Sequence, residues 1–179
     1  MKLFISLLHI GFRLAIFSWH FLLSFISVTL VMLMTSLGMI GPQSDVLSVA
    51  IISGSGNIPL IVGILPLIPF AITFASEWEE RAVSFWIIRS GVRAYAISKV
   101  MMSACSGFLA TFTGILLHTL LLWTQLPLYT NFQTGDAYAP LLDAEMPWLY
   151  LLSAAAHLSL SSALFAVAAL WISAYIPNK

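Results

Sequence analysis

The side chains of this chain that are suited to interaction chemistry are concentrated in one short segment, residues 76–99. The segment reads SEWEERAVSFWIIRSGVRAYAISK and carries half of the charged side chains of the protein. Carboxylate and guanidinium groups at this density can make charge-assisted hydrogen bonds with a partner. No other part of the chain offers a charged surface large enough to dock a second protein. The charged residues are Glu77, Glu79, Glu80, Arg81, Arg89, Arg93 and Lys99.

Three histidines that lie within apolar runs, His20, His118 and His157, are the other candidates for chemistry. Ionisable residues inside a membrane are commonly functional. His118 and His157 are expected at a similar depth, so a two-histidine metal or proton site is one alternative. No carboxylate or thiol accompanies them, which favours a packing role. A glutamate-type intramembrane protease would need histidines that face its glutamate, and no histidine motif lies near Glu79 or Glu80. We therefore expect neither catalytic residues nor a metal site.

The chain also lacks the sequence motif of a nucleotide-binding domain. The pattern G-x-x-x-x-G-K-[ST] does not occur, and Gly54-Ser55-Gly56 is followed by Asn57 and Ile58 where a P-loop would have its lysine. No basic cluster predicts a nucleic-acid partner. These observations predict a chain that is not an enzyme and that holds no cofactor of its own.

The composition indicates that lipid is the main solvent of this protein. Hydrophobic residues make up 60% of the chain and charged residues 8%, whereas soluble domains have about 25% charged residues. Such a chain cannot cover a surface that faces water. The single cysteine, Cys105, lies inside an apolar run, and we expect it to pack between helices.

Four apolar stretches approach the length of about 20 residues that a membrane-spanning helix needs. They are residues 14–40, 58–75, 100–123 and 148–176. The second is interrupted by three prolines, which kink a helix. With a short interfacial segment at Met1–Arg13, this predicts an all-α membrane protein of about four transmembrane helices that forms one domain over residues 1–179.

The charges orient these helices in the membrane. All seven basic residues fall in the N-terminus, in residues 76–99 or at the C-terminus, which an even number of crossings places on one side. The predicted loops at residues 41–57 and 124–147 contain acids but no Lys or Arg. The positive-inside rule therefore predicts cytoplasmic termini. Trp123 and Trp148, which bracket the second loop, fit an aromatic belt at the other face.

Helical periodicity predicts a short interfacial helix over residues 76–90. Trp78, Ala82, Phe85 and Trp86 share one face, and most of the charged residues lie opposite. Ser76 is suited to the N-cap and Gly91 to the C-terminal cap. Such a helix lies along a membrane surface with its aromatic face in the interface.

Two rows of small residues predict where the transmembrane helices approach one another closely. Small side chains four residues apart let membrane helices pack backbone to backbone. The rows are Ser103, Gly107 and Thr111 in the third span and Ala155, Ser159 and Ala163 in the fourth.

The segment after the second span resembles the coupling-helix region of ABC-2-type transporter permeases. In that family an acidic residue opens an interfacial helix, a short stretch of Arg, Ser and Gly ends it, and a Lys begins the next span. Tyr95 and Lys99 match the entry to the third span. The resemblance implies an ATPase-coupling interface made by Glu77, Glu79, Glu80, Arg81, Arg89, Ser90, Gly91 and Arg93.

The resemblance also implies the partners of the chain. It implies the permease subunit of an ABC exporter in the bacterial cytoplasmic membrane. A separate cytoplasmic ABC ATPase would hold ATP and Mg²⁺, and a second permease subunit would complete the pathway through the lipid bilayer. The chain departs from the family in its four predicted helices, where six are usual. The alternative is a membrane scaffold or an immunity-type binding subunit that transports nothing.

Overall fold

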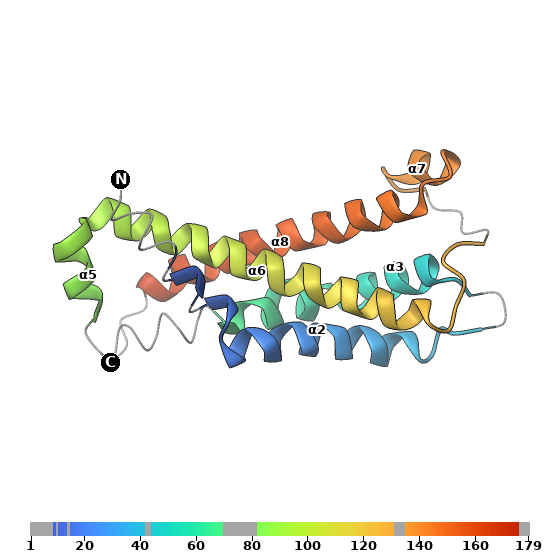
Figure 1. The fold of residues 1–179 in the computed structure, drawn as a ribbon, viewed down its shortest axis with the longest axis horizontal. Helices are drawn as coiled ribbons and strands as arrows, with labels where there is room; N and C mark the ends of the chain where they lie inside the picture. Colours follow the sequence, from blue (N-terminus) through green and yellow to red (C-terminus); the bar gives the residue numbers. More distant parts are fainter. Residues whose placement is uncertain are drawn as a thin grey trace.

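The computed structural model describes residues 9, 11–13, 15–41, 44–69, 82–130 and 135–175, and every element within them is helical. Three long helices, α2, α6 and α8, run side by side along the long axis of the molecule (Figure 1). A short helix, α5, lies across one end of this bundle, and α7 lies at the other end. We call these the α5 end and the α7 end. The long helices span Trp19–Ser36 (α2), Val92–Trp123 (α6) and Pro147–Tyr175 (α8).

The remaining elements are shorter. Helices α3 and η1, a π-helical segment, meet at a bend of 71° and form a fourth apolar unit together with the 3₁₀ turn η2. Within the described residues three helices are long and apolar enough to cross a membrane, or four if the bent pair is one span. The described part of the chain is therefore all-helical, and its long apolar helices indicate a membrane protein. The shorter elements are α3 (Val46–Gly56), η1 (Pro59–Ile64), η2 (Leu65–Leu67), α5 (Ala82–Ser90) and α7 (Ala139–Asp143).

Helix α3 is the main difference from the sequence prediction, which placed a loop at residues 41–57. The helix begins because Asp45 caps it: the Asp45 carboxylate accepts a hydrogen bond from the Ser48 amide at 2.7 Å, and the Ser48 hydroxyl faces back toward the Asp45 amide. This capping box satisfies amides that a helix start leaves free. The sequence prediction missed this helix because its Gly and Ser residues are common in loops.

The other helix bounds also shift. Helix α2 ends at Ser36, before the predicted end at residue 40, and α6 begins at Val92, well before residue 100. Helix α6 has 32 residues and is about 48 Å long at about 1.5 Å per residue, which exceeds the roughly 30 Å of a bilayer core. A helix of this length extends beyond the hydrocarbon or tilts within it, and α5 is joined to its first turn. Most of the predicted interfacial segment, Met1–Arg13, lies outside the described residues.

Prolines break the second span, and hydroxyl groups from the other three spans donate to its carbonyls. Pro66 has no N–H for the Val62 carbonyl four residues before it, and Ser162 of α8 donates to that oxygen at 2.8 Å. The Leu65 carbonyl, which already accepts from the Ile68 amide in the 3₁₀ turn, also accepts from the Ser24 hydroxyl of α2 at 2.7 Å. An unpaired carbonyl in lipid costs several kcal/mol, so the Ser162 hydroxyl stabilises the broken span at Val62.

Replacing Ser162 with alanine is expected to lower the free energy of unfolding by about 1–2 kcal/mol, because the Val62 carbonyl loses its donor. Ser161→Ala is the matched control, since the Ser161 hydroxyl bonds only to the His157 carbonyl of its own helix. Reversible unfolding in mixed micelles with SDS measures both values. An equal loss of unfolding free energy in the two variants would show that the Ser162 hydroxyl does not stabilise the Val62 carbonyl.

Candidate subunit-coupling site

Helix α5 turns sharply into α6 at Gly91, and the two helices form an elbow at the α5 end (Figure 1). Gly91 has a φ of +82°, a backbone conformation that side chains with a Cβ rarely adopt. The Gly91 amide donates to the Ile87 carbonyl at 2.9 Å, in the last turn of α5. The Gly91 carbonyl accepts from the Tyr95 amide at 3.1 Å, in the first turn of α6. One glycine therefore ends one helix and starts the next, as the sequence predicted for the end of α5.

The elbow presents two arginines and two large apolar side chains on its surface. Arg89, in the last turn of α5, is exposed and favourably placed at the negative end of that helix. Arg93 is exposed in the first turn of α6, where the helix dipole disfavours a positive charge. Neither arginine has an ion pair among the described residues. Phe85 is also exposed, and Ile88 is 86% exposed.

Buried contacts hold the base of the elbow. Tyr95 is buried, and the Lys99 ammonium lies 5.4 Å from the centre of its ring, within the range of a cation–π contact. The buried Ser98 hydroxyl donates to the Tyr95 carbonyl at 2.7 Å. Both residues that match the family at the entry to the third span thus pack together on α6.

The structure describes part of the coupling interface that the sequence predicted. Arg89, Gly91 and Arg93 come together at the elbow, and the backbone of Ser90 ends α5. The predicted acidic start of the interfacial helix and the arginine after it lie outside the described residues, so their position relative to the elbow stays a prediction. These residues are Glu77, Glu79, Glu80 and Arg81.

The row of small residues on α6 lies against α8. A Cβ on Gly107 would lie 2.9 Å from the Ala166 Cβ and 3.1 Å from the Ser162 carbonyl oxygen. The Thr111 hydroxyl lies 2.7 Å from that of Ser162. Small residues therefore bring two antiparallel backbones into direct contact. Of the other predicted packing residues, the structure buries Ser103, Ala155 and Ser159 and half-buries Ala163.

Two packing features were missed or misplaced by the sequence analysis. Gly114, two turns beyond Gly107, is packed against α2, where a Cβ would lie 2.7 Å from Val28 Cγ1. The spacing of seven residues between the two glycines was the available signal. The prediction for Cys105 was wrong, because its side chain is exposed on α6. An apolar side chain is equally compatible with lipid and with a neighbouring helix, so its type alone does not place it.

Polar contacts attach the start of α3 to the loop after α6, at the α7 end. Asp45 accepts from the Thr130 amide and hydroxyl at 3.0 and 3.1 Å, and the Val46 amide donates to the Pro127 carbonyl at 3.0 Å. Burial raises the pKa of Asp45, but hydrogen bonds from Ser48 and Thr130 outweigh burial and hold the pKa below its ordinary value. A lowered carboxyl pKa stabilises the fold at neutral pH, and this stability is lost as the pH falls through that pKa.

His118 and His157, the two residues of the alternative two-histidine site, have different surroundings. His157 is exposed, and its Nδ1 lies 2.9 Å from the Tyr138 hydroxyl. His118 is fully buried, and neither of its nitrogens has a partner in the described part of the chain. Across that same part no three metal-binding side chains gather.

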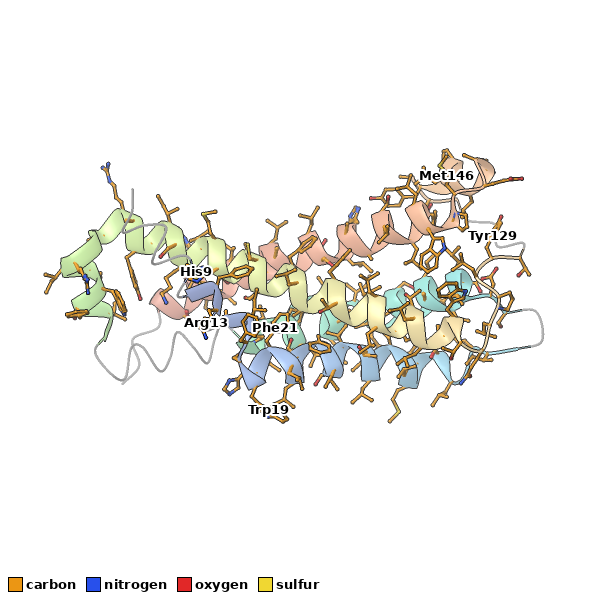
Figure 2. The ribbon with its side chains drawn as sticks, in the orientation of Figure 1. His9, Arg13, Trp19, Phe21, Tyr129 and Met146 are labelled. Carbon is orange, nitrogen blue, oxygen red and sulfur yellow. The ribbon has the colours of Figure 1, made fainter. Side chains whose placement is uncertain are left out.

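Side chains at the ends of the bundle are consistent with a membrane setting. Trp19 projects away from the start of α2, whereas Tyr129 and Met146 mark the α7 end (Figure 2). Trp123 and Trp148 contact each other there, with ring centres 5.0 Å apart. Aromatic residues at both ends are typical of the two membrane interfaces.

Comparisons with protein-family models, with curated proteins and with solved structures found no match to this chain. The geometry described above is therefore the basis for any functional conclusion.

Proposed function

We propose that this protein is the permease subunit of an ABC-type exporter and that α5 receives the movement of a separate ATPase subunit. The observation that supports the proposal is the elbow: a short helix lies across one end of a helical membrane bundle, joined by Gly91 to the longest helix. Exposed Arg89 and Arg93 provide charges that a partner can bind.

The packing of the bundle supports a mechanical role for α6. Its backbone contacts α8 at Gly107 and α2 at Gly114, so it is the central helix against which both neighbours rest. A force on α5 would tilt α6 and also act on the broken span, whose carbonyls are bound to three neighbours. Rigid-body tilting of this kind switches access between the two faces in transporters. In this proposal ATP and Mg²⁺ bind to the partner ATPase, and a second permease subunit completes the pathway.

A membrane scaffold or an immunity-type binding subunit is the alternative. The two proposals differ in one partner, the ATPase. If the native protein is solubilised in mild detergent and purified, the permease proposal expects an ATPase subunit in stoichiometric amount. Repeated recovery without any ATPase would favour the alternative.

The proposed orientation places α5 in the cytoplasm and α7 on the opposite side. Cysteines at Ser90 and Ala137, each in a chain with Cys105→Ser, should therefore react with a membrane-impermeant maleimide from opposite sides. We expect Ala137→Cys to label in intact cells and Ser90→Cys only after permeabilisation. Labelling of both in intact cells would contradict the orientation that was derived from the basic residues.

A further inference from the structure

Helix α3 lies between α6 and α8 in the half of the bundle that ends at α7. Val46 and Val49 pack against Leu122 of α6. Leu47 packs against Tyr150 of α8, and Gly54 faces both Leu158 of α8 and Met32 of α2. Toward the α5 end, by contrast, α6 and α8 touch directly at Gly107. Helix α3 therefore packs between α6 and α8 in this half, although Trp123 and Trp148 still contact each other at the α7 end.

Helix α3 is short, and its two ends are attached to the rest of the bundle by a small set of polar contacts. It has 11 residues and ends at a bend of 71°. Its start is attached to the loop after α6 mainly through the Asp45 carboxylate and the Val46 and Leu47 amides. Beyond its end, the Asn57 side-chain amide donates to the Thr35 hydroxyl at 2.6 Å. The bend lets α3 rotate relative to η1, and the hydrogen bonds of Asp45 hold the start of α3 in place.

His118 of α6 is fully buried, and both of its ring nitrogens are unsatisfied within the described residues. It belongs to the same face of α6 as Ile115 and Leu122. Ile115 belongs to the central apolar cluster with Ile61 and Val62, whereas Leu122 packs on α3. His118 therefore lies between the central cluster and α3. A buried donor or acceptor without a partner costs about 1–3 kcal/mol, so such a group needs an explanation.

Within the described residues, no charged group faces His118 from the elements packed against this part of α6. Helix α2 carries only His20, at its far end, and α8 carries only His157, which is exposed and bonded to Tyr138. The carboxylate at the start of α3 is bonded to Ser48 and Thr130. A neutral imidazole provides one donor and one acceptor in apolar surroundings. This suits a neutral hydrogen-bonding group and not an ion.

We propose that the α7 half of the bundle contains a binding site for a neutral amphipathic molecule, covered by α3, with His118 as its polar contact. When α3 swings about the bend after Gly56, His118 becomes accessible. The apolar side chains of Ile115 and Leu122 line the site on α6, and His118 bonds the hydroxyl or similar headgroup of the ligand. This site goes beyond the proposed function and does not depend on an ATPase.

Histidine carbethoxylation by diethyl pyrocarbonate, read for each residue by mass spectrometry, tests the covering helix. The full chain is used in lipid nanodiscs without any ATPase, so the outcome is independent of the coupling proposal. In the unaltered protein His118 should react at least tenfold more slowly than His157. Asp45→Ala, which releases the start of α3, should raise the His118 rate severalfold and leave the His20 rate unchanged.

Ser162→Ala is the matched control, because it destabilises the bundle away from the start of α3. It should leave the His118 rate at the level of the unaltered protein. An equal rise in both variants would show that His118 reacts only through general unfolding. No rise in Asp45→Ala would show that α3 does not cover an opening site. Either result overturns the proposal.

The ligand class is tested in Asp45→Ala with two probes that differ in one hydroxyl, 1-decanol and decane. Decanol should slow the carbethoxylation of His118 at least threefold, whereas decane at the same membrane concentration should not. Equal protection by both probes, or protection by neither, would rule out a site that recognises a hydrogen-bonding headgroup.

Discussion

Reversing three charges together, as Glu79→Lys, Glu80→Lys and Arg89→Glu, is expected to abolish ATPase binding and leave membrane insertion intact. These side chains belong to the charged segment that includes the elbow, where Arg89 is exposed and free of ion pairs in the described structure. Removing one partner of a desolvated charge pair costs about 2–5 kcal/mol. At about 1.4 kcal/mol per tenfold change, affinity would fall by about 30-fold or more.

Insertion should survive this triple change because the segment gains positive charge. Two acids become lysines and one arginine becomes an acid, so the positive-inside signal is strengthened. The measurement is co-purification of the ATPase and ATP-dependent transport at equal membrane abundance. Asp143→Asn, at an exposed carboxylate of α7, is the control and should change neither. Wild-type binding and transport by the triple variant would show that the segment only sets topology.

Introducing a Cβ at the two helix crossings is expected to destabilise the bundle severely. At Gly107 the new atom would lie 3.1 Å from the Ser162 carbonyl oxygen, and at Gly114 it would lie 3.1 Å from that of Phe25. Backbone atoms cannot rotate away, so α6 would have to move from both neighbours. Overpacking of this kind costs about 1–3 kcal/mol, which is the loss of stability expected for alanine at either glycine. The larger side chain of Gly107→Leu should cost more than this and prevent stable folding.

Gly63→Ala provides the comparison for the glycine variants. Gly63 is also helical, and a Cβ there meets nothing within 4 Å. Alanine is the better helix former by about 1 kcal/mol, so this variant should be neutral or stabilising. Thermal unfolding in detergent and monodispersity in size-exclusion chromatography would measure the variants at all three glycines. If Gly107→Ala and Gly63→Ala unfold at the same temperature, the close crossing of α6 and α8 does not exist in the protein.

Local patterns in the sequence were sufficient for the elements that depend on their own residues. The fourth span was predicted at residues 148–176, and α8 runs from Pro147 to Tyr175. The end of α5 at Gly91 was also predictable, because a positive φ strongly favours glycine. The bent span was harder to predict from the sequence. Its prolines signalled a break, but the capping box of Asp45 and Ser48 that starts α3 was not recognised.

The sequence by itself determined that this is a helical membrane protein, since 8% charged residues cannot cover a water-facing surface. Tertiary structure decided which side of each helix faces protein. Lipid and a helix neighbour are equally apolar, so hydropathy could not tell buried His118 from exposed Cys105. Ser24 and Ser162, whose hydroxyls donate to carbonyls of the broken span, lie far from them in sequence, and only the packing of four helical units brings them together.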